Sequence, residues 1–226
     1  MATIDRDLLD YLEDRITPER KERFLEILAS RTRFLTVALE DVFQMHNASA
    51  VIRSCDAFGI QEAHLIEGRF GQRLDKNIAM GAQQWVDIQR HKTSLDCIGE
   101  LRAKGYRIIA TVPSENAIPL QDFLLETPTA LFFGTEKEGL SPEVLKQADA
   151  AVYIPMFGFT ESLNVSVAAA ILLQRLREQL NASSLDWRLS ENEMLEKRMD
   201  WTCKSIHSAP QIINRYYTEK SGTRKI

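Results

Sequence analysis

The chain has 226 residues, of which 44% are hydrophobic and 27% charged, and its formal net charge at pH 7 is −4. This composition is that of an ordinary soluble globular protein with a full core, and the charge does not indicate a strongly basic nucleic-acid binder. No apolar run reaches the length of about 18 residues that a membrane span needs. The N-terminus also lacks the apolar stretch of a signal peptide, so we expect a cytoplasmic protein with no membrane partner.

Strand-like and helical segments alternate along the chain. The start is helical, because the apolar residues of 18–30 lie near one face of a helix. Strand-like runs follow at 34–39, 63–67, 85–88, 106–112, 130–133 and 151–155. Helical patterns lie between most of them, at 48–58, 95–104, 142–147 and 165–180. Strands that alternate with helices predict an α/β fold with a mostly parallel sheet and helices on both faces.

The alternation ends near 181–184, and a charged helical segment follows at about 191–206. Beyond this segment lies a tail with Tyr216, Tyr217 and several basic residues. The sequence therefore predicts an N-terminal helical extension at 1–30, one α/β domain at 31–180, and a C-terminal helical and basic extension at 181–226.

Basic side chains outnumber acidic ones in two segments. Between 68 and 107 they are Arg69, Arg73, Lys76, Arg90, Lys92, Arg102, Lys104 and Arg107. In the tail they are Lys204, Arg215, Lys220, Arg224 and Lys225. Both segments permit local contacts with phosphates, but solvated surface charge explains them equally well.

Thiols and imidazoles are scattered along the chain. The cysteines are odd in number and form no C-x-x-C pair, which fits reduced thiols better than a disulfide framework or a zinc site. These residues are Cys55, Cys97 and Cys203, with His46, His64, His91 and His207. We therefore expect no metal site.

A first polar motif, NASAVIRSCDAFG, covers 47–59. Asn47 stands where a helix N-cap is wanted, and the apolar residues after it form a stripe at helical spacing. Arg53 lies one step off this stripe, on the same face as Asp56. Two interpretations stay open: a surface pair of Arg53 and Asp56, which contributes little stability, or a guanidinium that projects into a cleft and binds a phosphate.

A second motif, GTEKEGLS, covers 134–141 and lies between an apolar strand and a helical pattern. It resembles the phosphate-binding loop G-x-x-x-x-G-K-[ST], but Leu140 replaces the lysine and two acids lie inside the loop, so an NTPase is not indicated. Glu136 could face a cationic ligand or order the loop. Alternatively, the segment is a simple connection in which Ser141 caps a helix that begins at Pro142.

A third motif, IPMFGFTESLNVSVAAA, joins a strand end at 154 to a helix of small and apolar residues. Ser162 and Asn164 flank Leu163. Helix capping by either residue is one interpretation. A functional site is the other, because polar groups between a buried strand and a buried helix usually belong to a site. The G-x-G-x-x-G fingerprint of a dinucleotide site is absent.

In this order and spacing, the motifs resemble those of the SPOUT methyltransferases, specifically the SpoU/TrmH family of RNA ribose 2′-O-methyltransferases. The resemblance covers about 31–180. It implies a SPOUT fold with a trefoil knot in its C-terminal half, an exception to the rule that chains do not thread their own loops. It also implies S-adenosyl-L-methionine as methyl donor and a homodimer whose active site draws on both subunits.

The resemblance assigns roles to individual residues. The expected catalytic residues are Arg53, Asn47, Glu136, Ser162 and Asn164. The donor is expected against loops that contain Thr111, Val112, Gly134, Ile154 and Leu163. Because an arginine side chain stays protonated, we expect Arg53 to bind an RNA phosphate and stabilise the developing alkoxide. That phosphate or a neighbouring one then accepts the proton. Ser162 and Asn164 are expected to orient Arg53, the ribose or the donor, Asn47 to fix the first motif, and Glu136 to order its loop and favour the cationic donor.

The short helical extensions, and the segment 20–41, are similar to those of tRNA-modifying members that methylate guanosine 18 in the D-loop. The expected function is therefore S-adenosylmethionine-dependent 2′-O-methylation of guanosine 18, with tRNA as the RNA partner. Methylation of ribosomal RNA or of another tRNA position is the alternative. A non-catalytic RNA-binding dimer is a second alternative, against which the retained motif residues argue.

Overall fold

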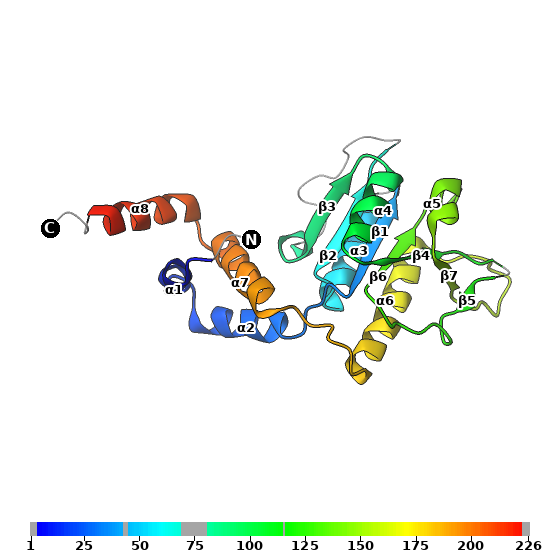
Figure 1. Ribbon diagram of the computed structural model, residues 1–226, viewed down its shortest axis with the longest axis horizontal. Coiled ribbons are helices and arrows are strands. Elements are labelled where there is room, and N and C mark those ends of the chain that lie inside the picture. The colour runs from blue at the N-terminus through cyan, green and yellow to red at the C-terminus, as the bar shows by residue number, and fades with distance from the viewer. Residues whose placement is uncertain (1–3, 43–44, 69–80, 115, 223–226) are drawn as a thin grey trace. The chain divides into compact units, whose positions relative to one another are not determined.

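The computed structural model describes residues 4–42, 45–68, 81–114 and 116–222, and the chain forms two compact units (Figure 1). The core unit comprises 32–187, and the terminal unit joins 1–31 with 188–226. The core unit extends past 180 because Thr32 donates its hydroxyl to the carbonyl of Trp187, and Arg177 lies over the Trp187 ring at 3.9 Å. None of the described helices has the length and apolar character needed to cross a membrane.

The core unit is built on a seven-stranded sheet with the strand order β3-β2-β1-β6-β4-β7-β5. All paired strands run parallel, which confirms the predicted α/β fold. The strands are β1 (Leu35–Glu40), β2 (Glu62–Ile66), β3 (Asp87–His91), β4 (Arg107–Thr111), β5 (Ile118–Pro119), β6 (Thr129–Phe133) and β7 (Ala150–Tyr153). Because β6, β4 and β7 are neighbours, the loops that follow them meet at one edge of the sheet.

Helices cover both faces of the sheet (Figure 1). Successive side chains of a strand point to opposite faces, so Leu35, Val37 and Leu39 pack with α3 and α6, whereas Ala38 packs with α4 and α5. The helices of the core unit are α3 (Met45–Ala57), the 3₁₀ helix η1 (Ala82–Gln84), α4 (Ser94–Ala103), α5 (Pro142–Gln147) and α6 (Val165–Ala182). The sheet is therefore buried on both sides, as its near-continuous apolar strands predict.

One strand begins later than the sequence predicts. The predicted strand at 85–88 is preceded by η1, which begins after Gly81, a residue with a φ of +100°. The backbone N–H groups of Trp85 and Val86 bond to the carbonyl of Ala82, so β3 can begin only at Asp87. Strand β5 was not predicted, because its two residues are too short to show a strand pattern.

The terminal unit is helical. Its helices are α1 (Arg6–Glu13), α2 (Pro18–Leu28), α7 (Glu191–Ser205) and α8 (Ala209–Gly222), so the predicted tail after 206 is largely a helix. Trp201 is buried and packs edge-on against Phe24, with ring centroids 5.5 Å apart. The buried carboxylate of Glu13 accepts hydrogen bonds from Arg198 at 2.7 to 2.9 Å and pairs with Lys21 at 2.6 Å.

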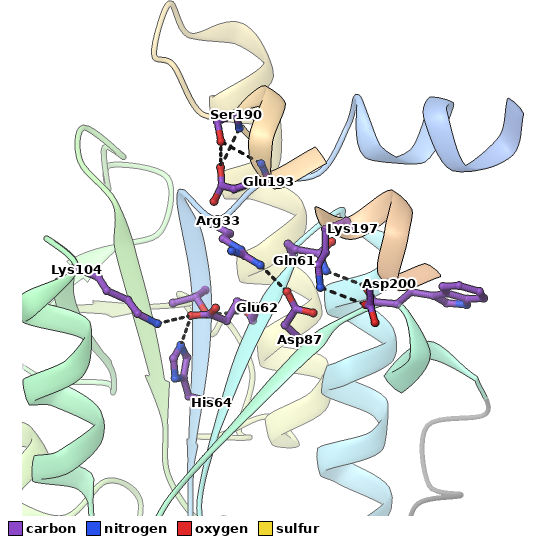
Figure 2. A network of polar contacts seen from close by, with 12 residues as sticks. Arg33, Gln61, Glu62, His64, Asp87, Lys104, Ser190, Glu193, Lys197 and Asp200 are labelled. Carbon is purple, nitrogen blue, oxygen red and sulfur yellow. Dashed lines mark hydrogen bonds and ion pairs between the residues drawn. The ribbon is translucent and has the colours of Figure 1, made fainter. Parts of the chain in front are cut away.

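Several basic residues of the segment 68–107 are engaged in ion pairs. The pairs are Arg90–Glu67 at 2.7 Å, Arg102–Asp149 at 3.2 Å and Lys104–Glu62 at 3.3 Å. Figure 2 shows Lys104 and Glu62 with His64 in one polar network. These contacts favour the surface-charge interpretation for this part of the chain. Arg69, Arg73, Lys76, Arg224 and Lys225 lie outside the described residues.

Candidate functional site

A cavity of about 460 Å³ opens where the loops after β4, β6 and β7 meet the start of α6. It is lined by residues 111–113, 133–136, 139–140, 152–154, 156, 161–165, 168 and 172. The parallel topology creates this position, because ligands of open α/β sheets bind outside the carboxyl ends of the strands. The volume lies within the range of roughly 300–1,000 Å³ that is usual for small-molecule sites.

The structure brings most of the predicted site residues to this cavity. The residues expected around the donor all line it: Thr111, Val112, Gly134, Ile154 and Leu163. So do three of the expected catalytic residues, Glu136, Ser162 and Asn164. Arg53 is different, because it is exposed on α3, does not line the cavity, and makes no hydrogen bond or ion pair with any described residue.

The loop after β6 is a tight turn in which two positions require glycine. Thr135 and Gly139 exchange backbone hydrogen bonds of 3.0 and 2.9 Å. Gly139 has a φ of +69°, which side chains disfavour. A Cβ atom on Gly134 would lie 2.1 Å from the carbonyl carbon of Gly139, so no side chain fits there. The turn projects Glu136 from its tip toward the cavity.

Asn47, Glu136 and Asn164 form one hydrogen-bonded group, with one residue from each polar motif. The Glu136 Oε1 atom accepts from Nδ2 of Asn47 at 2.6 Å and from Nδ2 of Asn164 at 2.8 Å. Nδ2 of Asn164 also donates to Oδ1 of Asn47 at 3.2 Å. Asn47 is buried and does not line the cavity itself, so it acts on the cavity through these two partners.

The predicted caps are confirmed at two positions and wrong at a third. Ser141 caps α5 by accepting from the N–H of Val144 at 3.3 Å, and Asn164 caps α6 by accepting from the N–H of Ser166 at 2.9 Å. Asn47 is not an N-cap, because α3 begins at Met45. Its side chain bonds to Glu136 of the second motif and Asn164 of the third.

Leu140, which replaces the P-loop lysine, is buried in the apolar layer beneath α5. The position of the phosphate-binding lysine of a P-loop is therefore apolar here, which supports the exclusion of an NTPase site.

Sequence reasoning missed two acidic residues at or near the site. Glu161 lines the cavity beside Ser162. Glu40 is buried at the end of β1, and its signal in the sequence was a charged residue that closes an apolar strand. The predicted set of polar residues was therefore incomplete around the cavity.

The charge of the cavity fits a cationic ligand. Among the described residues that line it, the charged ones are Glu136 and Glu161. Carboxylates in a partly enclosed site attract positive charge. A methyl donor with a sulfonium group carries such a charge, so the lining residues fit S-adenosylmethionine.

Comparison with known proteins connects the cavity to a family. The model of the SpoU rRNA Methylase family matches residues 34–174, a range that includes the entire cavity lining. The chain is 41% identical over 186 residues to the tRNA (guanosine(18)-2′-O)-methyltransferase of Borreliella burgdorferi. This match covers 82% of the chain and 85% of the relative.

Solved structures give the same result. The TrmH/SpoU tRNA modifying enzyme of A. aeolicus is similar, with a TM-score of 0.75, 30% identity, and coverage of 88% of this chain and all of that one. The SpoU methyltransferase AviRb from Streptomyces viridochromogenes, solved in complex with the cofactor AdoMet, has a TM-score of 0.59 and 27% identity. It is matched over 70% of this chain and 65% of its own length.

Proposed function

The chain belongs to the SpoU methylase family, and on this premise we propose that it transfers a methyl group from S-adenosyl-L-methionine to the ribose 2′-oxygen of guanosine 18 in tRNA. The observation that carries the proposal is the hydrogen-bonded group of Asn47, Glu136 and Asn164 at the acidic cavity. The similarity to tRNA enzymes, which covers 82% and 88% of the chain in the two comparisons, supports the choice of tRNA over ribosomal RNA.

The donor is proposed to occupy the cavity, where it supplies a methyl group on a positively charged sulfur. Thr111, Val112, Gly134, Ile154 and Leu163 would enclose it. The turn that begins at Gly134 leaves its backbone close to the ligand, since no side chain projects there. Glu136 is held in one orientation by two amides, so its carboxylate favours the cationic donor without a reorganisation cost.

The acceptor hydroxyl needs help from the protein, because a ribose 2′-OH is a poor nucleophile at neutral pH. Arg53 cannot serve as the base, since its guanidinium stays protonated. Its exposed guanidinium is instead suited to bind an RNA phosphate bidentately and to stabilise the developing alkoxide. The phosphate then accepts the proton, and Ser162 and Asn164 orient the ribose at the cavity.

A homodimer is part of the proposal. Exposed apolar side chains lie in the loop after β7 and on α6: Phe157 is 98% exposed, Phe159 108%, Val167 45% and Ile171 38%. Contiguous exposed apolar surface usually marks an interface, and we propose that these side chains contribute to one. A second copy of the chain would cover them. Arg53 does not line the cavity of its own chain, and in the proposed dimer it would face the cavity of the partner subunit.

Methyl transfer from labelled S-adenosylmethionine to purified RNA fractions tests the substrate class. We expect label in the tRNA fraction and none in ribosomal RNA. Label in ribosomal RNA alone would contradict the choice of tRNA. Donor binding without transfer to any RNA would favour a non-catalytic RNA-binding dimer.

A further inference from the structure

Glu40 is a buried carboxylate that the proposed mechanism does not use. It is the last residue of β1, its side chain is only 5% exposed, and it does not line the cavity. Burying a carboxylate is costly unless its oxygens accept hydrogen bonds from the protein. The partners of Glu40 therefore indicate what this residue contributes.

Glu40 bonds to the first residue of α4 and to the N-cap residue of α5. Its Oε2 atom accepts from the backbone N–H of Ser141 at 2.7 Å, and its Oε1 atom accepts from the Ser141 hydroxyl at 2.7 Å. Oε1 also accepts from the hydroxyl of Ser94, at the start of α4. Hydrogen bonds to an ionised acceptor are about twice as strong as neutral ones. Ser141 receives two of these contacts, one of them on its backbone.

Ser141 is the point at which the cavity turn ends. The turn leaves β6 after Phe133, which is paired with Leu39 of β1 in the sheet register. It lines the cavity at 133–136 and 139–140, and α5 begins directly after Ser141. Both ends of the turn are therefore tied to the end of β1, one through the sheet and the other through the Glu40 carboxylate.

We propose that Glu40 is a positioning residue for the donor-binding cavity: it fixes the turn 134–140 through Ser141 without contacting the donor. The inference rests on the proposed function of this cavity. With the turn fixed at both ends, Glu136 is held within hydrogen-bond distance of Asn47 and Asn164. When the Ser141 end is released, the turn samples positions in which Glu136 and the backbone at Gly134 no longer fit the donor.

The chain offers a matched pair of variants. Ser141→Ala and Ser94→Ala each remove one hydroxyl that donates to the same carboxylate oxygen. Ser141→Ala also removes the cap of α5, which Glu40→Gln leaves in place. Only Ser141 adjoins the cavity turn, because α4 contributes no residue to the described cavity lining. Glu40→Gln keeps the shape of the side chain and removes its charge. These variants separate a loss of positioning from a general loss of stability.

Three measurements on the full chain test the proposal: amide hydrogen exchange of 134–141 without ligand, the Kd of S-adenosylmethionine, and kcat with KM for the donor. We expect Glu40→Gln to weaken donor binding about tenfold and Ser141→Ala about threefold, with faster exchange confined to the turn. Ser94→Ala should leave the donor Kd within about twofold of the parent protein, whatever it does to thermal stability.

Equal effects of Ser141→Ala and Ser94→Ala on donor binding would overturn the proposal, and so would unchanged exchange of the turn in Glu40→Gln. If Glu40→Gln does not fold, Glu40→Asp, whose carboxylate is one methylene group shorter, replaces it with the same expected results for the turn and the donor Kd. If the parent protein does not bind the donor, the proposed function fails. The exchange measurement then decides alone whether Glu40 fixes the turn.

Discussion

Arg53 is the predicted catalytic residue that neither lines the cavity nor bonds to a residue that lines it. It is exposed, and it makes no hydrogen bond or ion pair with any described residue. The proposed partner of Arg53 is an RNA phosphate, which suits a guanidinium. Because this proposed contact forms only with RNA, we expect the donor site not to depend on it.

Arg53→Ala should lower kcat by at least about 100-fold, since it removes a charge that stabilises the transition state, and should leave the donor Kd unchanged. Turnover with labelled donor and calorimetric donor binding provide the measurements. Arg102→Ala, which removes an exposed arginine on α4 that pairs with Asp149, is the control and should retain turnover. Turnover near the parent level in Arg53→Ala would remove this residue from the mechanism.

Gly134 allows the cavity turn to close because it has no side chain. A Cβ atom there would lie 2.1 Å from the Gly139 backbone, so Gly134→Ala must displace the turn and should abolish donor binding. Gly99→Ala is a matched control, because nothing lies within 4 Å of its added Cβ. In the middle of α4, alanine should raise the free energy of unfolding by about 0.5–1 kcal/mol. Normal donor affinity in Gly134→Ala would show that the turn has room for a methyl group.

The contacts of single residues also show where reasoning from the sequence fails. Asn47 looked like an N-cap, because capping is a local preference, but its side chain bonds to Glu136, 89 positions away. Glu40 has its serine partners 54 and 101 positions away. Local patterns carry no information about such partners. The family motifs supplied the cavity residues, and the surrounding contacts became visible only in the fold.

Among the elements, β2, β3 and α4 enclose a pair of histidines. Nδ1 of His64 and Nε2 of His91 lie 2.9 Å apart, and Nε2 of His64 lies 3.1 Å from the Glu62 carboxylate (Figure 2 shows the Glu62–His64 contact). Burial and the neighbouring charge of His64 lower the pKa of His91 below its usual 6.5. Lys104 adds to this effect, and Glu100 and Asp96 oppose it.

The histidine pair makes stability depend on pH. Since the unfolded chain binds the His91 proton more tightly than the folded chain, stability should fall as the pH decreases from about 7 through the pKa of His91 in the folded chain.

Glu62 contributes to the pH dependence of stability at a lower pH. Burial alone would raise its pKa, but the hydrogen bond and charge of His64, with Lys104 and Arg33, lower it to about 2. Ionised Glu62 therefore stabilises the folded state fully above its usual pKa of 4.5, and this contribution is lost as the pH falls toward 2.

Unfolding measured in urea at pH 7, 6 and 5 tests this prediction. The parent protein should lose stability across the range, and His91→Gln should lose less, because its side chain does not titrate. His207→Gln, which changes an exposed histidine, should keep the parent slope. A slope that is unchanged in His91→Gln would contradict the assignment of this pH range to His91.

Most elements of the core unit could be predicted, because apolar periodicity is a local property. The strand predicted at 85–88 begins at Asp87 in the structure, because the turn after Gly81 includes Trp85 and Val86, whose N–H groups bond to Ala82. Strand β5 has too few residues to leave a pattern. The trefoil knot depends on how distant segments thread one another, and it stays a prediction of the family resemblance.

In the whole molecule, the two ends of the chain form one helical unit, whereas the sequence predicts two separate extensions. Glu13 and Arg198, which pair within this unit, are 185 positions apart. No local pattern links positions so distant, so the grouping of the termini was not predictable.

The proposed dimer predicts complementation between two inactive variants. If Arg53 acts on the cavity of the partner, a mixed dimer of Arg53→Ala and Gly134→Ala contains one complete site. Random mixing should then restore about a quarter of the parent activity, because half of the dimers are mixed and each has one working site of two. Turnover after joint refolding provides the measurement. No recovery in mixed dimers would place Arg53 at the cavity of its own chain.

The most direct test is methyl transfer from labelled S-adenosylmethionine to an unmodified tRNA transcript, with the modified nucleotide mapped. A matched transcript with 2′-deoxyguanosine at position 18 lacks only the acceptor oxygen. We predict one methyl group on the ribose of guanosine 18 in the first transcript and none in the second. Methyl groups on another nucleotide, or equal labelling of both transcripts, would contradict guanosine 18 as the target.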